Sequence, residues 1–186
     1  VSRALITTAL QAVAAQQLSS WHVAFPTDHE IELLRSHGLL VSHNVQFHWR
    51  DNGYGDFAGF MAAFSAERRR KLRAERRRVA ESGLRIEVRH GDEIDRGEWP
   101  TLHALYASTF DKYGNYAAFT AQCFADLAAA LGRRMVLFIA RADGVPVALS
   151  ICFRSADTLY GRYWGTSGNY HSLHFELCFY QGIDYC

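Results

Sequence analysis

The stretch MVLFIARADGVPVALSICF, residues 135–153, constrains the fold more than any other part of the chain. Two apolar runs flank Asp143-Gly144, a dipeptide that favours the positive φ angles of a two-residue hairpin turn. Because so short a turn joins only antiparallel neighbours, the two runs predict an antiparallel pair of strands inside a sheet.

The segments around this hairpin predict further strands and helices. Apolar residues recur at every second position in LRIEVRH (84–90), as in a half-buried strand. From Leu84 onward the patterns run strand, helix, helix, strand, strand, strand, helix, with helices at about 93–113 and 117–132, a third strand at 157–167 and a closing helix at 172–186. Connections between strands and helices predict an α/β fold, a mixed sheet with helices on its faces.

The first 83 residues contain both kinds of pattern as well. Helical spacing covers residues 2–17 and 28–38, whereas WHVAF (21–25) and LLVSHNVQFHWR (39–50) are typical of strands. A short apolar helix (56–64) and a charged helix (65–83) follow. We therefore expect three segments, namely 1–55, the connecting helices 56–83 and a domain at 84–186.

Composition limits the class of protein. Of the 186 residues 49% are hydrophobic, so the chain can form a packed core, and the net charge of +1 argues against binding polyanions by bulk charge. No apolar run approaches the roughly 20 residues of a membrane span, and no signal-peptide pattern occurs. The four cysteines do not have the spacing of a zinc site, which favours a reduced, cytoplasmic setting. Because helical patterns run into both ends, we expect part of a longer protein.

The charged helix carries eight of the twenty Lys and Arg residues, at positions 68–71, 73 and 76–78. One interpretation is a solvated helix whose arginines pair with Glu67 and whose buried stripe is Leu72 and Val79. The other is a phosphate-binding surface, since the arginine fork binds phosphate oxygens two at a time. For the second interpretation we single out Arg73, Arg76 and Arg77.

The motif YGRYWG (160–165) lies on the predicted third strand. Alternation would place Tyr160, Arg162 and Trp164 on one face and Tyr163 on the other. The motif fits either plain aromatic packing around a stacked arginine or a substrate-binding floor. In the second case Arg162 and Tyr163 would contact an acyl carbonyl or a phosphate.

Two other stretches combine polar and aromatic residues. The closing helix carries His174, Glu176 and Tyr180, which are common general acids and bases but are also common as hydrogen-bonded structural residues. As a strand, QFHWRDNGYGDF (46–57) would present Gln46 and His48 on one face and Trp49 on the other, before a turn and Tyr54. These residues could line a cleft or belong to an ordinary amphipathic strand.

Several motifs are absent from the sequence. It has no phosphate-binding loop for nucleoside triphosphates, no dinucleotide-binding glycine motif, no nucleophile elbow and no metal-binding histidine pair. We therefore expect no metal and no permanently bound cofactor.

Taken together, SSWHVAFP, QFHWRDNGYGDF, RRKLRAERR, LYGRYWG and LHFELCFYQGIDY resemble a bacterial family of predicted N-acyltransferases described as FemAB-like. The resemblance extends from about Ser19 to Cys186, although Leu72 and Ala74 stand where the family tends to carry Ile and Arg. It implies tandem GNAT-like folds, with the second half of one fold in 1–55 and a truncated second fold in 84–186. It also implies a role in peptidoglycan biosynthesis or recognition.

The resemblance implies two candidate acyl donors. GNAT folds commonly bind acyl-CoA through a turn of the form R/Q-x-x-G-x-G/A before a helix, and the nearest match, RADGVPVA (141–148), lies in the predicted hairpin. Relatives of the Fem type take an aminoacyl group from aminoacyl-tRNA. Because this match lies in a hairpin and not before a helix, we do not count it as a CoA-binding turn. The lack of such a turn and the arginine-rich helix favour the tRNA donor over acyl-CoA.

We therefore expect transfer of an acyl or aminoacyl group to an amine, in which the acceptor includes a peptidoglycan precursor. The proton acceptor would be His174 or Glu176, aided by Tyr163. Binding residues are expected on both sides of Leu84. Before it they are Gln46, His48, Trp49, Tyr54, Arg73, Arg76 and Arg77. After it they are Tyr160, Arg162, Trp164 and Tyr180. The alternatives are a non-catalytic module that recognises a cell-wall precursor and a nucleic-acid binder that uses the basic helix.

Overall fold

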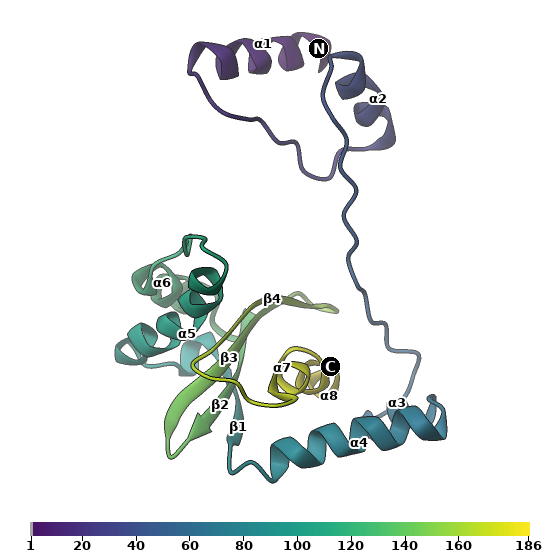
Figure 1. The fold of residues 1–186 in the computed structure, drawn as a ribbon, viewed down its shortest axis with the longest axis vertical. Helices are drawn as coiled ribbons and strands as arrows, with labels where there is room; N and C mark the ends of the chain where they lie inside the picture. Colours follow the sequence, from purple (N-terminus) through teal and green to yellow (C-terminus); the bar gives the residue numbers. More distant parts are fainter. Residues whose placement is uncertain (1) are drawn as a thin grey trace. The chain divides into compact units, whose positions relative to one another are not determined.

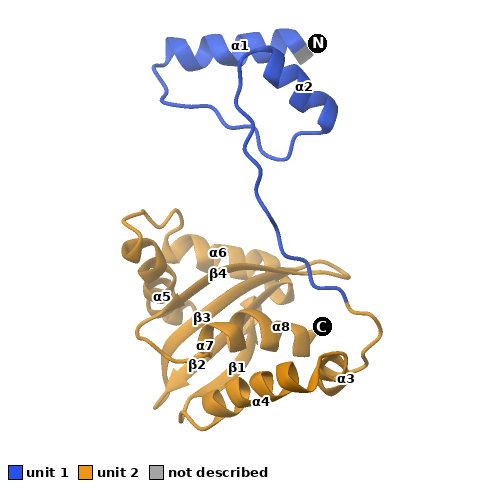
Figure 2. Cartoon of the chain, turned by 45° about the vertical axis from the view of Figure 1, so that its right-hand side comes forward, with its two compact units in different colours: residues 1–50 blue, residues 51–186 orange. Residues whose placement is uncertain are grey.

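The computed structural model describes residues 2–186, and the chain forms two compact units, residues 1–50 and 51–186 (Figure 2). The first unit contains α1 (Ser2–Ala15) and α2 (Asp28–Ser36). Thr27 and Glu30 form a capping box at the start of α2, because the Thr27 side chain accepts from the Glu30 backbone and Glu30 accepts from the Thr27 backbone N–H at 2.7 Å. Both helices were predicted from helical spacing and are confirmed.

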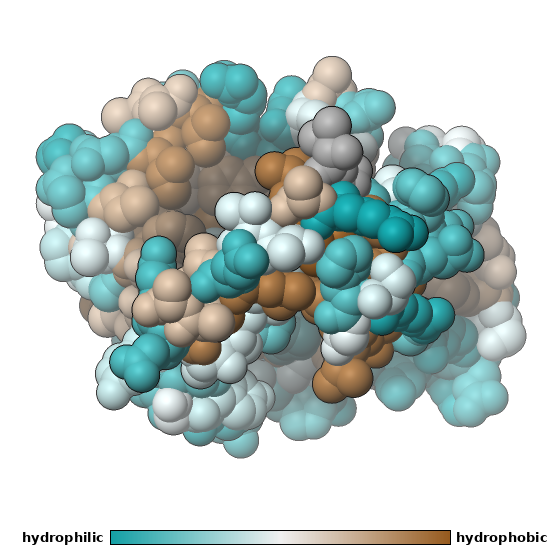
Figure 3. Space-filling model, turned by 90° about the horizontal axis from the view of Figure 1, so that it is seen from above, coloured by the Kyte–Doolittle hydropathy of each residue, from teal (hydrophilic) through white to brown (hydrophobic). Residues whose placement is uncertain are grey.

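The two strands predicted in the first unit are wrong. Residues 21–25 and 39–50 have no strand, and Phe25, Leu40 and Phe47 are 87%, 98% and 93% exposed. Alternation alone does not make a strand, since the backbone needs a neighbour to pair with, and no described strand pairs with these segments. These three apolar side chains therefore lie at the surface. The space-filling view shows apolar residues among polar ones on the surface (Figure 3).

The second unit carries the sheet and the remaining helices (Figure 1). Its elements are α3 (Phe57–Ala62), α4 (Ala66–Ala80), β1 (Arg85–His90), η1 (Gly91–Glu93), η2 (Arg96–Glu98), α5 (Trp99–Lys112), α6 (Ala121–Leu131), η3 (Gly132–Arg134), β2 (Met135–Ala142), β3 (Val145–Arg154), β4 (Leu159–Thr166), α7 (Leu173–Phe175), the π-helix η4 (Glu176–Tyr180) and α8 (Gln181–Tyr185). The order of elements predicted from Leu84 onward is therefore confirmed.

The four strands lie in the order β1-β2-β3-β4, and every neighbouring pair is antiparallel. The prediction of an α/β fold is confirmed, but that of a mixed sheet is wrong for the described residues. The reason is the pair of helices between β1 and β2, which brings the chain back to where it left the sheet. A Cβ at Gly91, just after β1, would lie 2.9 Å from the carbonyl of Ala128 and 3.0 Å from that of Gly132. The next strand therefore starts beside the end of β1 and runs back.

The hairpin between β2 and β3 has the turn that the sequence predicts. Asp143 and Gly144 adopt φ angles of 49° and 83°, both in the left-handed region that a type I′ turn requires. The hairpin is the middle of the sheet, and all of Met135–Ala140 is buried. Its two faces support two hydrophobic clusters.

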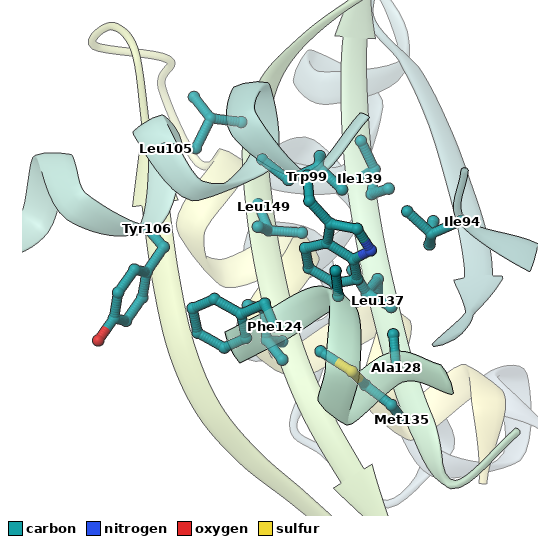
Figure 4. Close-up of a cluster of buried hydrophobic side chains, with 13 residues drawn as sticks. Ile94, Trp99, Leu105, Tyr106, Phe124, Ala128, Met135, Leu137, Ile139 and Leu149 are labelled. Atoms are coloured by element: carbon teal, nitrogen blue, oxygen red, sulfur yellow. The ribbon is translucent and has the colours of Figure 1, made fainter. Parts of the chain in front are cut away.

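One face of the sheet is covered by α5 and α6, and the other by α4 and the C-terminal helices (Figure 1). On the first face Trp99 and Phe124 stack with ring centroids 5.8 Å apart, above Leu137, Ile139 and Leu149 of the hairpin (Figure 4). On the second face a smaller cluster gathers around Val136, Phe138, Val79, Leu173 and Leu177. The polar groups described below border this second cluster.

Candidate functional site

Helix α4 brings the predicted arginines to the second face of the sheet. Ser65 caps the helix, since its side chain accepts a hydrogen bond from the Arg68 backbone N–H. Leu72 and Val79 are 5% and 3% exposed and form the buried stripe predicted for this helix. The stripe fixes which arginines face the protein and which face solvent.

Arg76 is the arginine of α4 that contacts Glu176 and Asp184 of the C-terminal helices. Its guanidinium lies 4.3 Å above the ring of Phe57 from α3, and the ring of Tyr180 contacts Phe57 edge-on at 6.1 Å. Nη2 of Arg76 also lies 3.1 Å from Asp184 Oδ2 and 3.1 Å from Glu176 Oε1. Two parts of the chain that are distant in the sequence, α3–α4 and η4–α8, are thus held together around one cation.

Glu176 is the buried partner of Arg76, with 4% of its surface exposed. Its Oε1 accepts hydrogen bonds from Arg76 Nε at 3.2 Å and from Gln181 Nε2 at 2.8 Å. Its Oε2 is also buried but has no hydrogen-bond partner within residues 2–186. A buried carboxylate oxygen without a donor is costly, and such a group calls for an explanation, for example a ligand.

The helix that carries Glu176 is irregular at this residue. The backbone N–H of Gln181 donates to the carbonyl of Glu176, five residues earlier, which defines the π-helix η4. The wider turn of a π-helix brings residues five apart onto one side of the helix. Gln181 therefore reaches Glu176. Single π-turns are frequent at functional sites.

A groove of about 410 Å³ lies beside this pair. Its wall is apolar, and its polar side chains are Arg76, Arg77, Glu176 and Gln181, with the lining completed by Val79, Ala80, Leu84 and Ile86. Arg77 is exposed, and its side chain forms no hydrogen bond or ion pair with the described residues. The groove is thus lined by a buried carboxylate and by an exposed guanidinium that has no partner among the described residues.

Tyr180 lies on the side of the π-helix that faces α4. Its hydroxyl donates to Glu75 Oε2 at 2.5 Å. Burial raises the pKa of Tyr180 strongly, and the neighbouring Glu75 adds to the shift. The phenol is therefore protonated at neutral pH and acts only as a hydrogen-bond donor here.

His174, the second predicted proton acceptor, lies apart from the groove. Its ring meets Trp164 edge-on with centroids 5.1 Å apart and also contacts Phe175 and Phe179. Partial burial lowers the pKa of His174, so the neutral imidazole prevails at pH 7. It does not line the groove that Glu176 lines.

The YGRYWG motif does not present one continuous face, which corrects the expectation from alternation. Ile151 pairs with Tyr163 whereas Cys152 pairs with Gly161, so Arg162 is an extra residue, a β-bulge on β4. Directly paired residues share a face. Tyr160 therefore lies on the face of its partner Phe153, towards α5 and α6, whereas Trp164 packs against the opposite cluster.

The bulge leaves Arg162 exposed, with its guanidinium 5.5 Å from the ring centroid of Tyr163. The predicted cation–π contact is therefore present, with Tyr163 as the partner. Tyr163 itself packs edge-on against Tyr106 at 5.0 Å, in the cluster beneath α5 and α6. Arg162 and Tyr163 thus lie outside the groove, and their proposed contact with a carbonyl stays a prediction.

Of the remaining predicted residues, Arg73 is exposed on α4 and makes no ion pair with the described chain. Tyr54 accepts a hydrogen bond from Asn52 at 2.9 Å and packs edge-on against Phe60, near Phe57 and Tyr180. Gln46 and His48 lie 3.2 Å apart in the first unit, where Trp49 is 38% exposed. A cleft shared by Gln46, His48 and Trp49 with the second unit stays a prediction.

The structure therefore brings together Arg76, Arg77, Glu176 and Tyr180 among the predicted site residues. Gln181 and Asp184 complete the site, and sequence analysis did not single them out as site residues. No sequence signal identifies them, because the π-turn brings Gln181 to Glu176 and a contact between residues 108 positions apart places Asp184 beside Arg76.

Burial affects the reactivity of two of the cysteines, Cys152 and Cys178. Burial raises the pKa of the Cys152 thiol to about 11 and that of Cys178 to about 12. Because only the thiolate reacts, at pH 8 on the order of one Cys152 thiol in a thousand is reactive.

We therefore expect iodoacetamide at pH 8 to leave Cys152 and Cys178 unmodified in the folded chain, as followed by peptide mass spectrometry. Reactivity should rise only as the pH approaches 11, and in urea both should react within minutes, because exposed thiols return to a pKa of about 8.5. Rapid alkylation of Cys152 in the folded chain at pH 8 would contradict the burial described here.

Comparisons of the sequence with known proteins complete this description. Within residues 2–186 no helix has the length and apolar character needed to cross a membrane, and no group of His, Cys, Asp and Glu side chains is arranged to hold a metal ion. The comparison with curated proteins gives no match. A family profile described as FemAB-like, peptidoglycan biosynthesis/recognition, matches residues 1–186. The chain therefore belongs to the FemAB-like family.

Proposed function

We propose that the chain is an N-acyltransferase that transfers an acyl or aminoacyl group to an amine, with a peptidoglycan precursor as the acceptor. Family membership connects the chain with peptidoglycan biosynthesis or recognition. The order of strands and helices in residues 84–186 and the antiparallel sheet support a GNAT-like fold for this part. The groove beside Glu176 is the proposed site.

The observation that carries the proposal is the state of Glu176. Arg76 and Gln181 hold one carboxylate oxygen, so the group is oriented, while the other oxygen has no donor among the described residues. An amine that enters the groove would supply the missing N–H donor to Oε2. A base must lie within hydrogen-bond reach of the proton that it removes, and a carboxylate fixed in this way meets that need.

The reaction balances with Glu176 as the proton acceptor. The amine nitrogen attacks the acyl carbonyl carbon, the new N–C bond forms, and the bond from this carbon to the donor oxygen or sulfur breaks. The proton lost by the amine goes to Glu176 Oε2, and the leaving group takes up a proton as the site returns to its starting state. Arg76 and Gln181 hold the carboxylate in place through Oε1.

Arg77 and Arg73 are proposed to bind the anionic part of a substrate. Arg77 lines the groove and Arg73 is exposed on the same helix. Neither has a partner within the described chain, so both guanidinium groups are available for phosphate or carboxylate oxygens. In contrast, the guanidinium of Arg76 is engaged by Glu176 and Asp184, and its proposed role is to orient Glu176.

The proposed donor is an aminoacyl-tRNA, with acyl-CoA as the alternative. The segment nearest to a CoA-binding turn, residues 141–148, lies in the β2–β3 hairpin and not before a helix. Helix α4 also exposes Arg70, Lys71, Arg73 and Arg77 without partners in the described part of the chain, as a phosphate-binding surface requires.

The test is an acyl-transfer assay on the full chain with a panel of acyl-CoAs and aminoacyl-tRNAs and peptidoglycan precursors as acceptors. With an active pair, Glu176→Gln should lower kcat about 10²- to 10³-fold, as expected for the loss of a general base. Glu87→Gln is the matched control, since Glu87 is also a poorly exposed carboxylate paired with an arginine, Arg141, but on the other face of the sheet. Undiminished turnover by folded Glu176→Gln would refute the role of Glu176.

A non-catalytic recognition module is the second candidate, and the position of His174 favours it. Of the two predicted proton acceptors, His174 packs against Trp164 outside the groove. Glu176 is then the single predicted base that lines the groove. In this case calorimetry would detect binding of a muropeptide or nucleotide-linked precursor, and the binding would survive both Glu176→Gln and His174→Ala while no donor gives turnover.

A further inference from the structure

A chain of hydrogen bonds joins helix α8 to the end of strand β1. The side chain of His90, the last residue of β1, is only 10% exposed. Its Nδ1 lies 3.3 Å from Glu93 Oε2, and its Nε2 lies 3.0 Å from the hydroxyl oxygen of Tyr185 on α8. The same hydroxyl oxygen accepts a hydrogen bond from Arg154 Nη1 at 2.9 Å. Strands β1 and β3 and helix α8 thus meet at one hydroxyl.

The direction of each hydrogen bond in this chain follows from its end groups. A hydrogen bond from the His90 backbone N–H lowers the pKa of Glu93, and Arg133 lies 3.4 Å away, so Glu93 is ionised and only accepts. Nδ1 of His90 therefore donates, and when the ring is neutral its Nε2 accepts from the Tyr185 hydroxyl. The network thus assigns one tautomer to His90.

Packing fixes the two rings in this arrangement. The rings of His90 and Tyr185 have centroids 6.0 Å apart, and Tyr185 meets Phe138 of β2 edge-on, also at 6.0 Å. Phe138 is fully buried in the middle of the sheet. The phenol is therefore packed against the buried middle of the sheet.

Helix α8 depends on this anchor and also supplies the groove. It has five residues, too few to be stable as an isolated helix. Gln181 at its start donates to Glu176 Oε1 at 2.8 Å, and Asp184 near its end lies 3.1 Å from Arg76. Whatever fixes Tyr185 therefore also fixes the two groups that align the Glu176–Arg76 pair.

We infer that His90 and Tyr185 are positioning residues, which hold α8 so that Gln181 and Asp184 keep Glu176 and Arg76 aligned in the groove. The effect on turnover rests on the proposed function, whereas the effect on the geometry of Gln181 and Arg76 does not. Because misplacing a reacting group by a fraction of an ångström slows a reaction, loss of the anchor acts on kcat more than on KM.

The test compares Tyr185→Phe with Tyr170→Phe in the full chain. Tyr185→Phe removes one hydroxyl and keeps the ring on Phe138. Tyr170 also packs against this cluster, but its hydroxyl makes no hydrogen bond with the described residues, so it controls for the loss of a phenol. Nuclear magnetic resonance follows the side-chain N–H signals of Gln181 and Arg76 and the ring nitrogens of His90.

We expect Tyr185→Phe to shift the signals of Gln181, Arg76 and His90 Nε2 and to lower kcat about tenfold with KM within about twofold. Tyr170→Phe should leave all of them in place. His90→Leu should reproduce the shifts of Gln181 and Arg76 and add little in the double variant, because the two residues act through one bond. If His90→Leu does not fold, Tyr185→Phe alone decides.

The outcomes separate this inference from the proposed function. Unshifted Gln181 and Arg76 signals in Tyr185→Phe would overturn the inference whatever the activity. If these signals shift while Glu176→Gln retains full turnover, the anchor stands and the proposed function fails. If the signals shift and kcat does not change, His90 and Tyr185 hold the helix only structurally, and the inference that they position the catalytic pair is overturned.

Discussion

Replacing Gly165 with alanine should destabilise the second unit by about 3 kcal/mol or more, which is at the upper end for overpacking. A Cβ at this position would lie 1.7 Å from the backbone oxygen of Leu105 and 2.3 Å from its carbonyl carbon. These atoms belong to α5, so the clash is with a helix backbone and not with a flexible side chain. Either α5 or β4 has to move.

Neither element can move without further loss, because side chains of α5 are hydrogen bonded to β4. Thr109 donates to the carbonyl of Trp164 at 2.6 Å, and Ser108 donates to that of Thr166 at 3.1 Å. Separating α5 from the strand would break both bonds and open the cluster around Trp99 and Phe124.

Gly161→Ala is the matched control for this prediction. Gly161 lies on the same strand, and a Cβ there would meet nothing within 4 Å. We expect this change to stay within about 0.5 kcal/mol of the original protein. Urea denaturation followed by circular dichroism measures both variants. Equal midpoints for Gly165→Ala and Gly161→Ala would show that α5 does not approach β4 as closely as described.

The contrast between the two glycines shows what the sequence can predict. Asp143-Gly144 predicts the hairpin correctly, because the conformation of a two-residue turn depends on the residues within it. In YGRYWG, both glycines lie on the predicted strand. Nothing in the local sequence distinguishes Gly165, which contacts α5, from Gly161, which is exposed. The bulge at Arg162 between them is also invisible in the sequence, and it reverses the face of every residue on one side of it.

The candidate site was predictable to a similar degree. Glu176 and the basic helix were recognised by residue type, and Leu72 and Val79 correctly predicted which side of the helix is buried. The pairing of Glu176 with Arg76 joins residues 100 positions apart, so a single sequence gives no sign of it. The strands predicted at 21–25 and 39–50 failed for a related reason, since a strand needs a partner that local pattern cannot supply.

Arg76→Leu is expected to cost about 3 kcal/mol of stability, because it leaves the buried carboxylate of Glu176 without its cation. Glu176 is 4% exposed and would retain only Gln181 as a donor. The change also removes the cation above the ring of Phe57. Arg70→Leu is the control, since Arg70 is exposed on the same helix and has no partner in the described part of the chain, and it should change stability by less than about 0.5 kcal/mol.

The double variant Arg76→Leu/Glu176→Leu separates the cost of an unpaired charge from the value of the pair. Replacing both members of a buried ion pair by apolar residues is often neutral or stabilising, so the double variant should recover most of the loss in urea denaturation. It should nevertheless remain inactive in acyl transfer, because the proton acceptor is gone. If the double variant were as unstable as Arg76→Leu, the loss would come from the contacts of Arg76 with Phe57 and Asp184, and not from the loss of a cation beside the Glu176 carboxylate.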